Sequence, residues 1–401
     1  MPHWAAQPGG TAAVLETFRV FLRLGLTAFG GPVAHLAYFR EAFVVQRRWL
    51  SEARFAEIVA LSQFLPGPAS SQTGMAIGML RAGWPGLLAA WVAFTLPSAL
   101  LLFGFAWLVQ QELIGAGGGW LSGVKAAVAA VVAHALFGMA RSLLRLRAHW
   151  LIAVAAATVM LLQGGVSAQL GVIGGSAALG LLLREQAAAP ESPPSGPARD
   201  ARAAVFCLLG FAALLAALPL APQLVELPGL AVLDRFYRAG SLVFGGGHVV
   251  LPLLHSEVVT TGWVSNDDFL AGYAAAQAVP GPLFAFSAYL GAVMQGGGAM
   301  TAVTALLGIF LPSILLVGGV LPFWERLRAV APVRRAVGGV NAGVVGLLAA
   351  VLWNPVLVEG VGGPASAGIA AAGLALLLHG RTPAWMVVLL AAVGGSLLFP
   401  D

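Results

Sequence analysis

Charged side chains and cysteines are both scarce in this 401-residue chain. Asp, Glu, Lys and Arg make up 9% of the residues, hydrophobic residues make up 59%, and the mean hydropathy is +0.89. Soluble domains carry about 25% charged residues, so this composition excludes an ordinary soluble protein and indicates a membrane protein. The one cysteine, Cys207, excludes an internal disulfide and a thiolate cluster, and its apolar surroundings favour a packing role.

Signatures of nucleotide-binding proteins and of several enzyme classes are also missing. The chain has no G-x-x-x-x-G-K-[ST] and no H-E-x-x-H, and GGGH at 245–248 lacks the context of a dinucleotide site. We therefore expect no catalytic residue, no metal, no cofactor and no nucleic-acid partner. A membrane-embedded hydrolase, such as a lipid phosphatase or an intramembrane protease, is the remote alternative, but the clustered acids or Ser/His pair that it needs do not stand out.

Long apolar runs are the main positive feature of the sequence. A helix needs about 20 residues to cross the hydrocarbon core, and several runs approach or exceed this length. The N-terminus lacks the pattern of a cleaved signal, so the chain is expected to insert through its own helices, as a multi-pass protein of the cell inner (plasma) membrane surrounded by the lipid bilayer. The predicted apolar helices cover 86–109, 120–140, 149–162, 168–183, 203–220, 299–321, 336–353, 364–379 and 384–399.

The second half of the chain repeats sequence motifs of the first half in the same order. FLRLGLTAFGGP at 21–32 returns as FYRAGSLVFGGG at 236–247, SQFLPGP at 62–68 returns as AQAVPGP at 276–282, and FTLPS at 94–98 returns as IFLPS at 309–313. Such ordered matches indicate an internal duplication. We expect an N-terminal transporter repeat at 12–183, a flexible cytoplasmic linker rich in Pro, Ser and Ala at 184–202, a connecting transmembrane helix at 203–220, and a C-terminal repeat at 221–400.

The distribution of arginine predicts that the two repeats have opposite orientations. The segment 40–54 carries four arginines, whereas its second-half equivalent carries Glu257, Asp267 and Asp268 and no basic residue. Two later loop pairs also differ in arginine content. The segment 326–335 is arginine-rich and its first-half equivalent 110–119 is not, while 141–147 is arginine-rich and its second-half equivalent 354–363 is not. Because short cytoplasmic loops carry the basic excess, the pattern predicts an all-α polytopic membrane protein with two inverted-topology repeats, an architecture common in secondary transporters.

Two kinds of helix-breaking motif recur inside apolar sequence, Pro-Gly-Pro at 66–68 and 280–282 and Phe-Gly-Gly at 29–31 and 244–246. If 55–80 crossed the bilayer, the basic cluster at 141–147 would lie outside; a segment that enters, breaks and returns keeps it inside. We therefore expect each half to contain two broken or re-entrant helical hairpins, one at each motif, in addition to its transmembrane helices. Close helix packing without any other role is the alternative reading of these glycines and prolines.

Broken helices inside a membrane protein expose backbone amides and the positive end of the helix dipole, and both suit a small anion. The hydroxyl and amide side chains after the first Pro-Gly-Pro add neutral donors, while the second break has mainly apolar neighbours. Lys125, the only lysine, starts an apolar run and would add a full positive charge. An interfacial position near a helix end is the alternative for Lys125.

Four blocks of the chain, GLTAFGGPVAHLAYFRE (25–41), LSQFLPGPASSQTGMAIG (61–78), SLVFGGGHVVLPLL (241–254) and AAQAVPGPLFAFSAYLG (275–291), resemble the chromate ion transporter family in its long, two-half form. The resemblance implies a secondary transporter that exports chromate across the inner membrane and confers chromate resistance. A carrier of sulfate or another oxyanion and an anion channel are the alternatives, and a homodimer is a possible assembly. The candidate substrate-binding residues are Phe29, Gly30, Gly31, Gln63, Pro66, Gly67, Pro68, Ser70, Ser71, Gln72, Lys125, Phe244, Gly245, Gly246, His248, Gln277, Pro280, Gly281 and Pro282.

Overall fold

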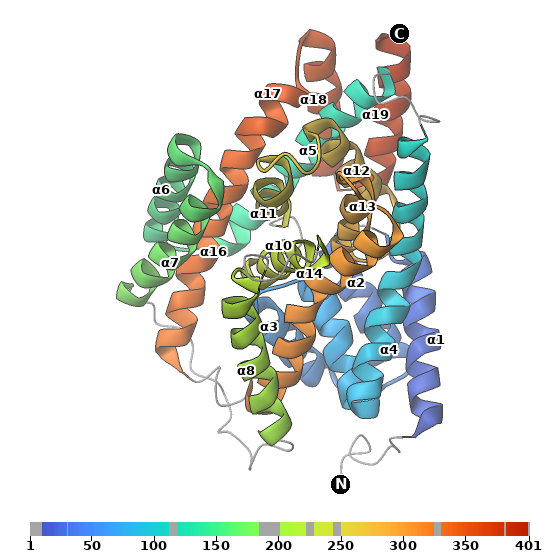
Figure 1. Ribbon diagram of the computed structural model, residues 1–401, viewed down its shortest axis with the longest axis vertical. Coiled ribbons are helices and arrows are strands. Elements are labelled where there is room, and N and C mark those ends of the chain that lie inside the picture. Colours follow the sequence, from blue (N-terminus) through green and yellow to red (C-terminus); the bar gives the residue numbers. More distant parts are fainter. Residues whose placement is uncertain are drawn as a thin grey trace.

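The computed structural model describes residues 10–29, 31–111, 119–183, 201–221, 228–243, 250–324, 330–380 and 382–399. Within these ranges the regular secondary structure is helical, without a strand, as the sequence predicts (Figure 1). Four of the described helical segments are long and apolar enough to cross a membrane, and several shorter apolar helices accompany them. The prediction of an all-α polytopic membrane protein is thus confirmed.

The helices of the two halves follow in a corresponding order, with two exceptions. The first half contains α1 (Thr11–Thr27), α2 (Gly31–Arg40), α3 (Glu52–Phe64), α4 (Ala69–Gln110), α5 (Gly119–Leu143), α6 (Arg147–Gln163) and α7 (Gly165–Leu182). Helix α8 (Ala201–Ala217) joins the halves. The second half contains α10 (Pro228–Leu242), α11 (Val250–Leu254), α12 (Asn266–Ala278), α13 (Phe286–Val293), α14 (Ala299–Val320), α16 (Ala331–Val351), α17 (Val358–Gly360), α18 (Pro364–Leu378) and α19 (Ala384–Leu398). Helices α13 and α14 take the place of α4, and the short α17 is additional.

Local signals recur with the same spacing. A π-helical turn follows α2 at Glu41–Gln46, and another follows α11 at His255–Val259. Ser51 caps α3 by accepting from the backbone N–H of Arg54, and Ser265 caps α12 by accepting from that of Asp268. A serine cap contributes about 1 kcal/mol to helix stability, so both helices begin where their own sequence specifies.

Helix α4 reverses direction at Ala82 and Gly83. Gly83 has φ +65°, and a Cβ atom at either Gly78 or Gly86 would overlap the carbonyl oxygen of the other glycine. Residues eight apart in a straight helix are about 12 Å apart along the axis, so this contact requires two helical arms packed side by side. Arg81 lies at the reversal, where its guanidinium stacks over the Trp49 ring at 4.8 Å. The chain thus turns back on itself after Arg81, and a re-entrant hairpin at the first Pro-Gly-Pro stays a prediction.

The outer helices are exchanged between the halves. Helix α5 of the first half packs against α18 and α19 of the second half, and α16 of the second half packs against α6 and α7 of the first (Figure 1). Small residues permit the close approach, because Gly123 meets the backbone of Ala391 on α19 and Gly343 meets the Ser176 side chain on α7. Gly-x-x-x-Gly spacing lets helix backbones touch inside a membrane, where dispersion replaces the hydrophobic effect.

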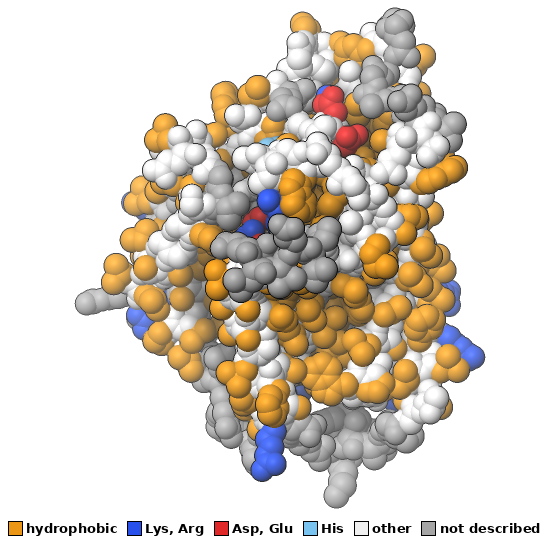
Figure 2. Space-filling view, viewed as in Figure 1, with side chains coloured by type: hydrophobic (Ala, Val, Ile, Leu, Met, Phe, Trp, Pro, Cys, Tyr) orange, Lys and Arg blue, Asp and Glu red, His pale blue; other side chains and the backbone are white. Residues whose placement is uncertain are grey.

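The surface of these helices is suited to lipid. Large apolar side chains stand exposed on α6, α7, α8 and α19, among them Leu162, Leu182, Phe206 and Leu397, each more than 70% exposed. Figure 2 shows hydrophobic side chains over much of the lower part of the visible face. Water-soluble monomers rarely leave contiguous apolar patches of this extent uncovered, so lipid tails are the matching solvent.

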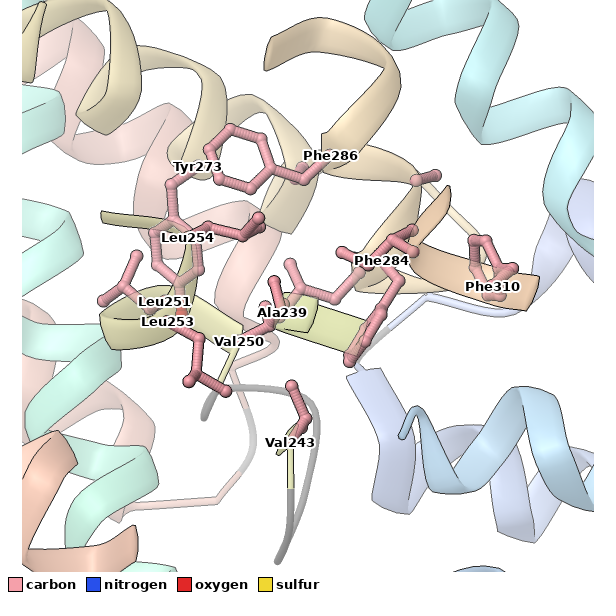
Figure 3. Close-up of a cluster of buried hydrophobic side chains, with 14 of the residues drawn as sticks. Ala239, Val243, Val250, Leu251, Leu253, Leu254, Tyr273, Phe284, Phe286 and Phe310 are labelled. Carbon is pink, nitrogen blue, oxygen red and sulfur yellow. The ribbon is translucent and has the colours of Figure 1, made fainter. Parts of the chain in front are cut away.

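A cluster of aromatic and aliphatic side chains surrounds the second break (Figure 3). Phe284 and Phe286, which follow the second Pro-Gly-Pro, are buried, and Phe284 packs against Phe310 of α14 with ring centroids 6.0 Å apart. Ala239 and Val243 from the end of α10 and Leu254 from α11 belong to the same cluster. The second break is thus bounded by apolar groups, in agreement with the sequence.

The packing of the two arms of α4 can be tested by a substitution at their contact. In Gly78→Ala the new methyl group overlaps the Gly86 carbonyl and the Ala90 side chain, so we expect a loss of about 1–3 kcal/mol of stability, the usual range for overpacking. Gly104→Ala in the same helix meets nothing within 4 Å and should be neutral or slightly stabilising. Thermal unfolding of the two purified variants in one detergent measures this difference, and equal melting temperatures would contradict the packing of the two α4 arms.

Candidate functional site

The two Pro-Gly-Pro turns meet the other half of the chain at the centre of the molecule. The Gly67 N–H donates to the carbonyl oxygen of Val243 at 2.6 Å, and the Gly281 N–H donates to that of Ala28 at 3.0 Å. Ala28 and Val243 occupy equivalent positions, each one residue before a Phe-Gly-Gly motif. Each Pro-Gly-Pro turn is therefore hydrogen-bonded to the residue that precedes the Phe-Gly-Gly motif of the other half.

Each central glycine has both a special conformation and a close neighbour. Gly67 has φ +126° and Gly281 has φ +99°, values that disfavour any residue with a Cβ atom. A side chain at Gly67 would strike Gln72 and Ser313, and one at Gly281 would strike Ser98. The prolines on both sides of each glycine have no N–H, so the glycine amide is the one donor that a Pro-Gly-Pro turn can offer.

The N-terminus of α4 supplies the polar groups of the first break. Ser70, Ser71 and Gln72 are each at most 3% exposed. The Gln72 Nε2 atom donates to the Pro66 carbonyl oxygen at 2.6 Å and to Ser313 Oγ at 3.2 Å, which ties the turn to α14 of the other half. Ser71 Oγ is buried and makes no hydrogen bond with any described residue. The Gln72 N–H donates to the Pro68 carbonyl oxygen, and the Gln72 Oε1 atom, an acceptor, is also buried without a partner among the described residues. The Ser71 hydroxyl is therefore the unpaired donor that the described side chains of this turn offer.

His35 connects the two breaks. Its Nε2 atom lies 3.1 Å from the Ala28 carbonyl oxygen, and its Nδ1 atom lies 3.3 Å from Ser70 Oγ. Since a carbonyl oxygen can only accept, Nε2 carries the hydrogen and Nδ1 accepts from the Ser70 hydroxyl. Ala28 therefore accepts from both Gly281 and His35, and the first turn of α4 is linked through His35 to the second Pro-Gly-Pro.

Sequence reasoning did not place His35, Ser98 or Ser313 in the site. Ser98 and Ser313 end the repeated segments FTLPS and IFLPS, and each lies against the glycine of the opposite half's Pro-Gly-Pro. Their recurrence was a usable signal, but a sequence does not show that the repeated serine faces the other repeat. His35 lies in the block 25–41, where nothing in the local sequence distinguishes a site histidine from a packing one.

Other predicted site residues lie around this centre or apart from it. Pro68, Pro280 and Pro282 are buried in the turns, and Pro66 is half-buried. Gln63 at the end of α3 is exposed, while Gln277 is half-buried and hydrogen-bonds with Tyr273. Phe29 is partly exposed and faces Trp385 of α19 at 5.9 Å between ring centroids. Gly31 starts α2 with φ +76°. Gly30, Phe244, Gly245, Gly246 and His248 lie outside the described residues.

Lys125 forms an ion pair. Its Nζ atom lies 2.5 Å from Oδ1 of Asp267, at the start of α12, and its side chain is 18% exposed. The pair joins the exchanged helix α5 to the second half. A role for Lys125 as the positive charge of the anion site stays a prediction, and it would require the ammonium to be shared with or released from Asp267.

A buried centre of broken helices inside apolar, lipid-facing helices defines a multi-pass helical membrane protein of the kind that moves solutes through its interior. A family model described as chromate transporter matches residues 15–181 and again 230–396, once in each half. The chain belongs to the chromate transporter family, in its two-half form, and is a transporter rather than an enzyme.

Several curated relatives span most of the chain. A chromate transport protein of Pseudomonas aeruginosa is 33% identical over 406 residues, covering 96% of this chain and 92% of the relative. A probable chromate transport protein of Synechococcus elongatus is 32% identical, covering 82% and 81%. A chromate transport protein of Cupriavidus metallidurans is 28% identical, covering 84% and 81%. No solved structure matches the chain.

The His35 bridge predicts coupled loss of order at both breaks. In His35→Leu, the Ser70 hydroxyl loses its partner and Ala28 keeps only Gly281, so we expect a cost of about 1–3 kcal/mol from buried, unsatisfied polar groups. His379→Leu, at an exposed position after α18, is the control and should stay within about 0.5 kcal/mol of the parent. Thermal unfolding in detergent reports both, and an unchanged melting temperature for His35→Leu would contradict the bridge.

Proposed function

We propose that this protein is a secondary transporter of the inner membrane that exports chromate and thereby confers chromate resistance. The observation that carries the proposal is the first turn of α4, where Ser71 Oγ is buried without a hydrogen-bond partner among the described residues, beside the Pro-Gly-Pro turn at the centre. Helix N-termini favour anions through their free amides and their dipole. The relatives named as chromate transport proteins supply the identity of the oxyanion.

The inverted architecture would let one site face each side in turn. The reciprocal bonds from Gly67 to Val243 and from Gly281 to Ala28 relate the two halves in the same way, as expected for repeats that rock against each other. An inside-negative potential favours exit of a divalent anion by about 2.3 kcal/mol per charge for every 100 mV. Export therefore requires no nucleotide hydrolysis.

A flux measurement tests the substrate and the site together. Proteoliposomes with an imposed potential should take up labelled chromate saturably, and sulfate, which has a similar shape and charge, should compete. Ser71→Ala removes the hydroxyl that lacks a partner, and we expect it to raise the KM for chromate about tenfold, since a hydrogen bond to a charged group contributes about 1.5–3 kcal/mol. Gln72→Ala removes the two bonds that hold the turn in place, so we expect it to raise the KM through displacement of the turn. Ser396→Ala, an exposed hydroxyl that bonds its own helix, is the matched control.

The outcomes separate the alternatives. If folded protein moves sulfate and not chromate, the proposed substrate is wrong; if flux rises linearly with chromate and shows no trans-stimulation, the protein is a channel. Unchanged KM values in both variants would remove the α4 turn from the site while leaving the transport activity standing.

The orientation of the repeats has its own test. In a Cys207→Ser background, Arg54→Cys and Arg81→Cys should both be labelled by an impermeant thiol reagent from the cytoplasmic side, because α3 and the first arm of α4 enter and return. Asp268→Cys should be labelled from the opposite side. Labelling of positions 54 and 81 from different sides, or of 54 and 268 from the same side, would rule out the inverted re-entrant arrangement.

A further inference from the structure

A charged network lies between α10 and the π-helical turn at His255–Val259. Arg238 donates two hydrogen bonds to the Glu257 carboxylate, from Nε to Oε1 at 2.8 Å and from Nη2 to Oε2 at 2.9 Å. Its Nη2 atom also lies 3.2 Å from Oδ2 of Asp234. Arg235 donates to the backbone carbonyl oxygen of Glu257 at 2.5 Å and stacks over the Trp263 ring at 4.1 Å.

The network is more deeply buried on its acidic side than on its basic side. The Glu257 side chain is 4% exposed and that of Asp234 is 11% exposed, whereas Arg238 is 21% exposed and Arg235 is half-buried. Figure 2 shows basic and acidic side chains together in the middle of the visible face, over the region of α10 and α11. Burying an ion pair is often no better for stability than burying apolar groups of the same volume, so a structural role alone does not explain it well.

The position of the network relates it to the candidate site. Val243, whose carbonyl oxygen accepts from Gly67, follows directly after α10, and Arg238 lies five residues earlier. At 1.5 Å per residue, Arg238 is about 8 Å along the helix axis from the central turn. An anion that enters past Arg235 and Arg238 would thus arrive next to the first Pro-Gly-Pro.

The described residues of the first half contain no equivalent network at the corresponding positions. In the alignment of FLRLGLTAFGGP with FYRAGSLVFGGG, Arg23 corresponds to Arg238 and is exposed, and at the same spacing Ala42 corresponds to Glu257. Three arginine–glutamate pairs of the first half are Arg40–Glu52, Arg54–Glu57 and Arg81–Glu16, and none of them joins α1 to the π-helical turn that follows α2. The charged network is therefore specific to the second half, opposite in character to the polar, uncharged first break.

We propose that Arg235 and Arg238 form a second anion-binding site on the route to the central turn, and that the Glu257 carboxylate occupies this site in place of the oxyanion. The Glu257 carboxylate accepts two parallel hydrogen bonds from one edge of the Arg238 guanidinium, and two oxygens of a tetrahedral oxyanion can accept from the same edge. A dianion that displaces Glu257 gains the contacts to Arg238 and the charge of Arg235, whose own hydrogen bond is to a backbone carbonyl. The inference rests on the proposed oxyanion transport and names a second step of it.

Removing the resident charge tests the proposal. Glu257→Gln keeps an oxygen that accepts from Arg238 but removes the negative charge that competes with the ligand. Sulfate and chromate binding to the purified full chain, measured by equilibrium dialysis at fixed ionic strength, should become about tenfold tighter. Arg235→Gln should weaken binding by a similar factor, and Arg235→Lys, which keeps the charge, should restore most of it.

Glu52→Gln is the matched control, because it makes the same change at the exposed Arg40–Glu52 pair and should leave the affinity unchanged. Unchanged or weaker binding in folded Glu257→Gln protein would overturn the proposal. If Glu257→Gln does not fold, an Arg235→Gln protein that binds sulfate as tightly as the parent overturns it instead. Chromate flux of the parent protein in proteoliposomes tests the transport separately from the second site. Flux without a change of affinity in the variants refutes only the second site. Tighter binding to Glu257→Gln without flux refutes only the transport.

Discussion

The pairing of each Pro-Gly-Pro glycine with a carbonyl of the opposite half is the constraint on which the structure depends. A broken helix inside a bilayer leaves backbone groups without partners, and hydrocarbon offers none. The Gly67 N–H donates to the Val243 carbonyl oxygen, and the Gly281 N–H donates to the Ala28 carbonyl oxygen. Both acceptors lie at the ends of the helices that precede the Phe-Gly-Gly motifs. Neither half can satisfy its own break, so the two repeats must fold around each other.

The outer helices likewise pack against the opposite half of the chain. Helix α5 is covered by α18 and α19, and α16 by α6 and α7, so each repeat supplies the packing surface that the other lacks. Glycines such as Gly123 and Gly343 keep the helix backbones close where polar contacts are few. The Lys125–Asp267 pair adds one charged tie between α5 and the second half.

Duplication did not leave the two breaks chemically equal. The first is followed by Ser70, Ser71 and Gln72, while the second is followed by Phe284 and Phe286 within an aromatic cluster (Figure 3). The second half instead carries its polar character on α10, in the network of Arg238 and Glu257. Neutral donors therefore lie beside the first break, and paired charges lie about 8 Å along α10 from it.

The sequence by itself determined the class, the duplication and the positions of the helices, because apolar length, repeated motifs and helix-breaking residues are local properties. The predicted run 299–321 is α14 (Ala299–Val320), and 384–399 is α19 (Ala384–Leu398), within a residue or two. Only the tertiary structure decided which groups meet. That Ser98 and Ser313 lie against the opposite glycines, that His35 joins the two breaks and that Lys125 is held by Asp267 depend on how the repeats interlock. The His35–Ser70 hydrogen bond spans 35 positions, and these contacts between the two halves span 142 or more, so no local pattern could reveal them.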